Sequence, residues 1–250
     1  TFNLLYQLPE KYYLKNFNEN NFVSSNPNNR FSIIWSNNIT NIFLLLITVS
    51  IAALVLIFNN VLTKNRKFFL YFRICFLTWI LVWLGWIIGG QLSVIHLINF
   101  FEIIFSFNNN FSTFLAEPII LLVGIVTVIS FFIWGRALFC GWLCPFGALQ
   151  ELFSILSKRF GIRQMALPNY LDKNIRYLKY FLLAIIIIGT TLEFNLTKYL
   201  YNIEPFKTAI TLRFIAPINI VMWAVFLLII NLFIERAYCR YICPLGAGLA

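Results

Sequence analysis

The feature that most restricts the fold of this chain is a series of long apolar runs. A helix needs roughly 20 mainly apolar residues to cross a bilayer, and about 17 suffice. Five runs approach this length, near residues 39–58, 68–89, 117–134, 177–194 and 216–234. With 60% hydrophobic and only 11% charged residues, the chain does not have the composition of a soluble domain. We therefore predict an all-α integral membrane protein with about five transmembrane helices.

The distribution of Lys and Arg predicts the orientation of these helices. The turn at 59–67 and the loop at 135–176 are rich in Lys and Arg, the loop at 90–116 has none, and the loop at 195–215 has few. Because positive residues concentrate in cytoplasmic loops, the net charge of +10 reflects membrane topology and no nucleic-acid contact is expected. The sequence predicts a multi-pass protein with its N-terminus outside.

The first 38 residues differ from the rest. The part from Asn16 to Arg30 is rich in Asn and has no apolar period, so it cannot bury enough surface to fold alone. We expect residues 1–38 to form an N-terminal extracytoplasmic tail or linker, and residues 39–250 to form the transmembrane core. Because the chain begins with Thr1 and has no initiator Met, we also expect it to be a piece of a longer protein.

Two copies of one cysteine motif follow apolar runs. Motif 1 (residues 140–148) and motif 2 (residues 239–247) both read Cys-x3-Cys-Pro-x-Gly-Ala, at an offset of 99 residues. The same offset relates Pro118 to Pro217, which begin the preceding apolar runs. The pattern predicts a parallel internal repeat in which a helix is followed by Cys-x3-Cys-Pro. Because an even number of spans separates the motifs, both are predicted to be cytoplasmic.

The motif cysteines are the candidate cofactor- and metal-binding residues. They are Cys140, Cys144, Cys239 and Cys243. Cytoplasmic thiols stay reduced, so disulfides are not expected. Cys-x3-Cys-Pro matches the tail of the bacterial ferredoxin run. Four thiolates could hold an iron–sulfur cluster, bind a soft metal such as Cu(I) or Zn, or act as redox dithiols. Cys75 lies alone within a span and is expected to pack in the core.

The residues after Cys144 predict a short amphipathic helix. An apolar stripe is formed by Leu149, Leu152, Phe153 and Leu156, and polar residues including Gln150, Glu151 and Ser154 lie opposite. Gly161 is a suitable stop for this helix. Such a helix would lie on the cytoplasmic membrane surface and cover the cysteine site, or would serve as an ordinary connection.

Several longer stretches resemble the NosR family, the polyferredoxin-type membrane proteins of bacterial nitrous-oxide reduction. The cysteine motifs alone are shared with NapH-type polyferredoxins, whereas the stretch Glu204–Ile210 points to NosR more narrowly. The matching stretches are Tyr6–Pro9, Trp83–Trp86, Gln91–Val94, Phe139–Leu152, Glu204–Ile210 and Cys239–Ala247.

This resemblance implies a protein of the bacterial inner membrane that passes electrons to support a periplasmic nitrous-oxide reductase, both its activity and its expression, in denitrification. It also implies a [4Fe-4S] cluster, and FMN only in a domain outside this chain. The implied partners are membrane lipid and the nitrous-oxide reductase system, with quinol as a further candidate.

Other functions remain open from the sequence. The four thiolates would also suit a membrane metal-handling or assembly factor for Cu or Fe, or a redox-sensing regulator. The sequence has no phosphate-binding Gly loop, Ser-His-Asp set or paired-carboxylate motif, so no catalytic residue is assigned. We expect an electron-transfer protein and not a stand-alone enzyme.

Overall fold

The structure, a computed structural model, describes residues 34–90, 92, 118–135, 137–162, 164–165, 168–191, 206, 209–210, 214 and 217–249. Within these ranges the regular elements are all helices, and no β-strand occurs. The predicted all-α fold is therefore confirmed for the part of the chain that is described. Most of the predicted N-terminal tail, residues 1–33, lies outside the described residues.

Helices lie close to each predicted membrane span. They are α3 (Ile39–Ile57), α5 (Arg66–Trp79) with its π-helical continuation η2 (Ile80–Ile88), α8 (Pro118–Trp134), α11 (Leu178–Thr191) and α13 (Ile218–Phe233). By length and apolar character, α3 with 19 residues and the continuous helix Arg66–Ile88 with 23 residues could cross a membrane. The apolar helices α8 and α13 are shorter.

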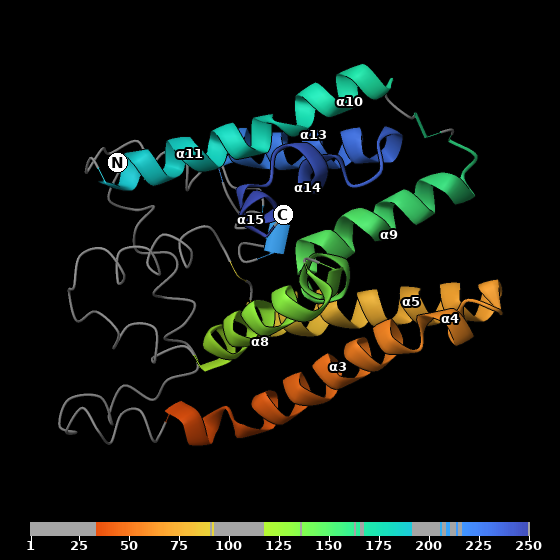
Figure 1. Ribbon diagram of the computed structural model, residues 1–250, viewed down its shortest axis with the longest axis vertical. Coiled ribbons are helices and arrows are strands. Elements are labelled where there is room, and N and C mark those ends of the chain that lie inside the picture. The colour runs from red at the N-terminus through yellow and green to blue at the C-terminus, as the bar shows by residue number, and fades with distance from the viewer. Residues whose placement is uncertain are drawn as a thin grey trace.

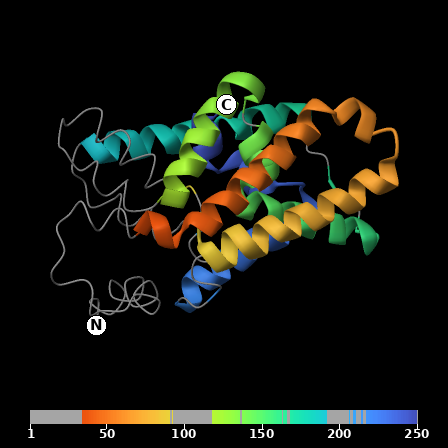
Figure 2. The ribbon, with the colours of Figure 1, turned by 90° about the horizontal axis from the view of Figure 1, so that it is seen from below.

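The remaining helices are short, apart from α9. They are α4 (Asn59–Leu62), η3 (Phe139–Leu143), α9 (Pro145–Arg159), α10 (Asn169–Arg176), α14 (Ala237–Tyr241) and α15 (Pro244–Gly248). Figures 1 and 2 both show α3 and α5 as a helical hairpin that is joined through α4.

Helix α9 occupies the centre of the arrangement. It contacts α5 and η2 on one side and α13 on the other, and in Figure 1 it lies between these two layers. Helix α8 packs against α3, and α11 packs against the C-terminal helix α15. Since α9 begins within motif 1, directly after Cys144, its central position brings that motif into contact with both layers.

The predicted amphipathic helix is present, but its polar face is buried as well as part of its apolar stripe. Helix α9 contains the predicted range and is followed by Gly161, whose left-handed φ of 75° suits a helix end. Its polar residues Gln150 and Glu151 are buried, whereas Leu156 of its apolar stripe is 47% exposed. The polar face is turned inward because α5 and α13 supply it with partners, as described below.

Large apolar side chains cover much of the outer surface of α3, α8 and α13. Phe43, Phe132 and Met222 are each more than half exposed, at 65%, 81% and 63%. An apolar surface of this extent is unfavourable in water and suits contact with lipid.

Candidate functional site

Each cysteine motif forms a helix–cysteine–proline–helix turn. In motif 1, η3 ends at Leu143, Cys144 is extended, and Pro145 begins α9. In motif 2, Cys243 is extended and Pro244 begins α15. A residue before proline avoids the α-helical region, and proline itself is favoured in a first helical turn. The Cys-Pro pair therefore breaks one helix and starts the next, as the sequence predicts.

The turns direct backbone N–H groups at sulfur. The N–H of Gly246 donates to Sγ of Cys243 at 3.3 Å. In motif 1, hydrogen bonds from the N–H groups of Gly147 and Phe146 lower the pKa of Cys144, although burial outweighs them and the pKa is raised. N–H groups that point at sulfur stabilise a thiolate or a metal-bound sulfur, so the turns suit ligands.

Glycine in each motif allows the chain to come close to the first cysteine. A Cβ atom at Gly147 would lie 3.0 Å from the carbonyl oxygen of Cys140 and 3.8 Å from Sγ of Cys144. A Cβ atom at Gly246 would lie 3.4 Å from the carbonyl oxygen of Cys239 and 3.6 Å from Sγ of Cys243. Glycine is therefore a packing requirement of the turn in motif 1, whereas in motif 2 a Cβ atom would make an ordinary contact.

The two motifs lie against each other. The ring of Phe146 in motif 1 meets the ring of Tyr238, which precedes motif 2, edge to face at a centroid distance of 5.4 Å. Phe206 contacts both rings, at 4.8 Å and 5.3 Å. Nη1 of Arg236 donates to the carbonyl oxygen of Cys140 at 3.5 Å.

The four motif thiols share one neighbourhood. Burial raises the pKa of Cys239 well above its usual value, and the charges of the other three motif thiols raise it further, while Arg236 lowers it. Cys144 and Cys243 are buried, and Cys140 and Cys239 are partly exposed. Cys75 is exposed on α5, so the prediction that it packs in the core is wrong. Its side chain points out of the bundle, where lipid would be its neighbour in a membrane.

Four cysteine thiols are the ligand set that iron–sulfur clusters use. Within the described residues, no three Cys, His, Asp or Glu groups are placed to hold one metal ion together. A single Zn²⁺ holds all its sulfur ligands about 2.3 Å from one atom. The cysteine sulfurs around an iron–sulfur cluster lie farther apart, because the cluster itself lies between them. Four thiols with amides directed at sulfur meet the chemical requirements of a cluster.

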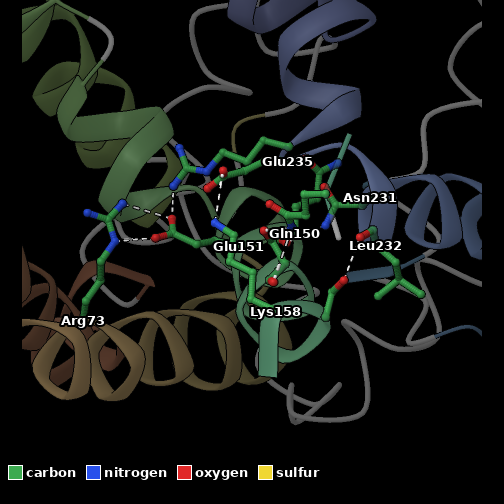
Figure 3. A network of polar contacts seen from close by, with 11 residues as sticks. Arg73, Gln150, Glu151, Lys158, Asn231, Leu232 and Glu235 are labelled. Carbon is green, nitrogen blue, oxygen red and sulfur yellow. Dashed lines mark hydrogen bonds and ion pairs between the residues drawn. The ribbon is translucent and has the colours of Figure 1, made fainter. Parts of the chain in front are cut away.

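An ionic cluster lies beside the motifs, and sequence reasoning did not find it. Glu151 of α9 forms an ion pair with Arg73 of α5 (Figure 3) and a second one with Arg236. The guanidinium of Arg73 also lies over the ring of Trp142 in motif 1, 5.0 Å from its centroid. Arg73 is the residue that could have revealed this cluster from the sequence, because an ionisable residue inside an apolar run needs a partner.

The same face of α9 is joined to α13. The side-chain amide of Asn231 donates to the carbonyl oxygen of Gln150, and Ser157 donates to the carbonyl oxygen of Leu232 at 2.7 Å. Figure 3 shows these contacts next to the Glu151 ion pairs. They give partners to Ser157 and to the backbone of Gln150, whereas the side-chain amide of Gln150 is buried with no hydrogen-bond partner among the described residues.

A second polar cluster holds motif 2 from the other side. Asp172 of α10 accepts hydrogen bonds from the hydroxyl of Tyr241 at 2.6 Å and from Arg240 at 2.7 Å. Arg240 and Tyr241 lie between the two cysteines of motif 2. The hydrogen bonds of Tyr241, Arg176 and Arg240 hold the pKa of Asp172 well below its usual range. The carboxylate therefore fixes the middle of the motif to α10.

Stretches that are distant in sequence also meet at Gly85. A Cβ atom there would lie 3.0 Å from Cβ of Pro145 and 3.3 Å from Cγ2 of Ile210. The indole N–H of Trp86 donates to the carbonyl oxygen of Ala209 at 3.4 Å. Trp83–Trp86, motif 1 and Glu204–Ile210 are three of the stretches on which the NosR resemblance rests, and residues from each of them meet here.

Comparison with known proteins agrees with this site. Residues 115–163 and 215–248 match the family model of a 4Fe-4S binding domain, and each matched segment contains one motif. The family match and the NapH relatives support an iron–sulfur cluster as the cofactor, as the resemblance to NosR implies. No solved structure matches the chain.

Several curated proteins are similar to the chain. NirI of Paracoccus denitrificans is 40% identical over 216 residues, which are 86% of this chain and 32% of that protein. The regulatory protein NosR of Stutzerimonas stutzeri is 38% identical over 218 residues, 87% of this chain and 30% of that protein. The ferredoxin-type protein NapH of Escherichia coli is 25% identical over 66% of this chain and 56% of that protein. The chain thus spans about a third of the length of NirI and NosR.

Proposed function

Because this chain is homologous to NirI and NosR over most of its length and carries a 4Fe-4S binding domain, we propose that it is the membrane core of a redox protein of denitrification. In this proposal it passes electrons that support the activity and expression of a periplasmic nitrous-oxide reductase. The observation that carries the proposal is the meeting of two Cys-x3-Cys-Pro turns, far apart in sequence, through the ring contact of Phe146 with Tyr238.

The four motif cysteines are the proposed ligands of one iron–sulfur cluster. When bound, such a cluster supplies reversible one-electron transfer. The residues of the chain have distinct tasks around it. Backbone N–H groups of Gly147 and Gly246 hydrogen-bond to ligand sulfur, and the packed rings of Phe146, Phe206 and Tyr238 restrict access of water. Arg236 brings positive charge to the thiolates.

The proposed membrane arrangement has five spans and a parallel repeat. The spans correspond to α3, the α5–η2 helix, α8, α11 and α13, and residues 1–38 form a periplasmic tail ahead of a core at 39–250. Support comes from the length of α3 and of Arg66–Ile88 and from the apolar surface of α3, α8 and α13. The Lys and Arg distribution favours a cytoplasmic position for both motifs, so electrons would enter on that side.

The partners of the protein follow from this arrangement. Lipid would surround the apolar helices, and the nitrous-oxide reductase system would receive the electrons on the periplasmic side. Quinol is a candidate electron donor because it is a membrane-soluble reductant. FMN is expected only in a domain outside this chain.

A redox-sensing regulator is the second candidate, because the relative from Stutzerimonas stutzeri is named regulatory protein NosR. Both functions use the same cysteines, and they differ in what the redox state controls. The two functions can be separated by expressing the reductase from an independent promoter. Under that condition, nitrous-oxide reduction still requires the motif cysteines if the chain is an electron carrier. A regulator becomes dispensable under that condition.

The experiment that tests the proposal is cofactor analysis of the purified chain. We expect four iron atoms and four acid-labile sulfides per chain, and a broad visible absorption that dithionite bleaches. A variant in which all four motif cysteines are serine should lose iron, sulfide and absorption together. Stoichiometric copper or zinc without sulfide would instead identify a metal-handling protein.

A further inference from the structure

We propose that Glu151 and Arg236 form a charge pair that sets the reduction potential of the cysteine-bound centre, with Arg236 as the residue that acts on the cluster. The inference rests on the proposed function, since it requires a cluster at the four motif cysteines. It adds to that function two positioning residues that are not ligands.

The position of Arg236 is the first argument. It lies in the turn between α13 and α14 with φ 52° and ψ 42°, a left-handed conformation that non-glycine residues rarely adopt. Such a conformation persists only where the surroundings hold it. Here the guanidinium is held by the carbonyl oxygen of Cys140 and by the carboxylate of Glu151. The turn thus places a cation against motif 1 directly before motif 2.

The charge state of the pair is the second argument. Burial favours the neutral carboxyl of Glu151, but the hydrogen bond from Arg73 and the charges of Arg236 and Arg73 lower its pKa below the usual value. Arg236 is charged because a guanidinium keeps its proton in proteins, and the carboxylate of Glu151 pairs with it directly. One carboxylate between two guanidinium groups leaves one net positive charge next to the site.

The effect on a cluster follows from electrostatics. Reduction adds one electron, and therefore one negative charge, to a cluster held by four thiolates, and no bond forms or breaks. Positive charge nearby favours the reduced form, and in a partly buried site this interaction is poorly screened by water. Net charge is one of the recognised determinants of cluster potentials. Removing Arg236 should lower the potential, and neutralising Glu151 should raise it.

The chain contains a matched control. Lys158 and Glu235 form an ion pair at 3.3 Å between the same two segments, α9 and the turn after α13. Both side chains are 53% exposed, so water screens the pair. Glu235→Gln removes one carboxylate next to Arg236 in sequence and leaves the Glu151 cluster intact.

The experiment is a potentiometric titration of the purified chain, followed by the electron paramagnetic resonance signal of the reduced cluster. Glu151→Gln should favour reduction about tenfold, which is about 59 mV for one electron, and Arg236→Met should disfavour it by a similar factor. Arg236→Lys, which keeps the charge, should lie closer to the parent than Arg236→Met. Glu235→Gln should equal the parent.

The outcomes separate the two proposals. Shifts of opposite sign in Glu151→Gln and Arg236→Met support the charge pair, and Glu151→Gln alone decides if Arg236→Met is not recovered from the membrane. Unchanged potentials, shifts of the same sign, or an equal shift in Glu235→Gln overturn it. A parent chain without iron and sulfide overturns the proposed function itself, and with it this inference.

Discussion

Nη1 of Arg236 lies 3.5 Å from the carbonyl oxygen of Cys140, and this contact joins two residues that are 96 positions apart in the sequence. Arg236 lies in the turn between α13 and α14, and Cys140 is the first cysteine of motif 1. The same guanidinium pairs with Glu151, which also binds Arg73. Glu151 therefore connects α5, α9 and the turn before motif 2, and its loss should affect more than one contact.

The first prediction concerns stability. Glu151→Ala should destabilise the chain by about 2–3 kcal/mol, because it leaves two partly buried guanidinium groups without their carboxylate. The loss is smaller than for a fully buried ion pair because water partly screens both guanidinium groups. Lys158→Ala, which breaks the exposed pair with Glu235, should cost less than about 1 kcal/mol. Unfolding of both variants in detergent, followed by circular dichroism, measures the difference. Equal losses would show that Glu151 is no more important than a surface residue.

The second prediction concerns the motif glycines. Gly147→Ala should cost about 1–3 kcal/mol and lower the iron content, because its Cβ would press on the carbonyl oxygen of Cys140 at 3.0 Å. Gly246→Ala should be milder, since its nearest contact is 3.4 Å. Gly141→Ala is the control within motif 1, because a Cβ atom there would meet no atom within 4 Å. Iron per chain and the unfolding midpoint should both follow this order, and a larger loss in Gly141→Ala would contradict it.

The third prediction concerns pH. Hydrogen bonds from Tyr241, Arg176 and Arg240 hold the pKa of Asp172 below its ordinary value of 3.8. A lowered carboxyl pKa stabilises the fold at pH values above the ordinary value, and this stabilisation is lost as the pH falls toward the lowered pKa. Asp172→Asn should therefore be less stable than the parent at pH 7, and the difference should shrink below about pH 4.

Thermal unfolding of the two proteins at pH 7 and pH 3 measures this change. Tyr241→Phe removes one of the three hydrogen bonds to Asp172. Its stability at pH 7 should therefore lie between that of the parent and that of Asp172→Asn. A difference between parent and Asp172→Asn that is the same at both pH values would mean that the carboxylate charge of Asp172 does not stabilise motif 2.

The helices and the cysteine turns could be predicted from the sequence because their causes are local. Apolar length places α3 and the α5–η2 helix, the proline after Cys144 and Cys243 fixes the breaks, and Gly161 fixes the end of α9. Each of these depends on residues a few positions apart. The agreement of the predicted and observed elements reflects this short range.

The contacts around the site could not be predicted in this way. Amphipathicity identifies which face of α9 is polar, but it does not say whether that face meets water or a partner. The partners of Glu151 are Arg73 and Arg236, 78 and 85 positions away. Only the packing of α5 and α13 against α9 brings them together. For the same reason, the exposure of Cys75 depends on which face of α5 contacts α9, and a single apolar run does not reveal this.

The fourth prediction concerns topology. Reporter fusions after Asn59, Lys158 and Ala250 should report the cytoplasm, and fusions after Asn109 and Asn202 should report the periplasm. The reason is the concentration of Lys and Arg in the turn at 59–67 and the loop at 135–176. Paired phosphatase and fluorescent-protein fusions give opposite signals at each position and so control for expression. A periplasmic signal after Lys158 would contradict the cytoplasmic placement of motif 1.

The fifth prediction concerns nitrous-oxide respiration. Cys144→Ser combined with Cys243→Ser should abolish whole-cell reduction of nitrous oxide in a strain that carries the change in its full-length protein. Serine is similar in size to cysteine, so packing around these two buried positions is preserved while the soft sulfur ligand is lost. The amount of protein in the membrane should stay near the parental level, which immunoblotting checks.

Cys75→Ser provides the control for this last variant. Its thiol is exposed on α5 and lies in neither motif, so respiration should stay near the parental rate. If the double variant also respires at the parental rate with normal protein levels, the motif cysteines do not carry the electrons. The electron path would then lie in the part of the full-length protein beyond this chain, and α3 to α15 would serve as its membrane anchor.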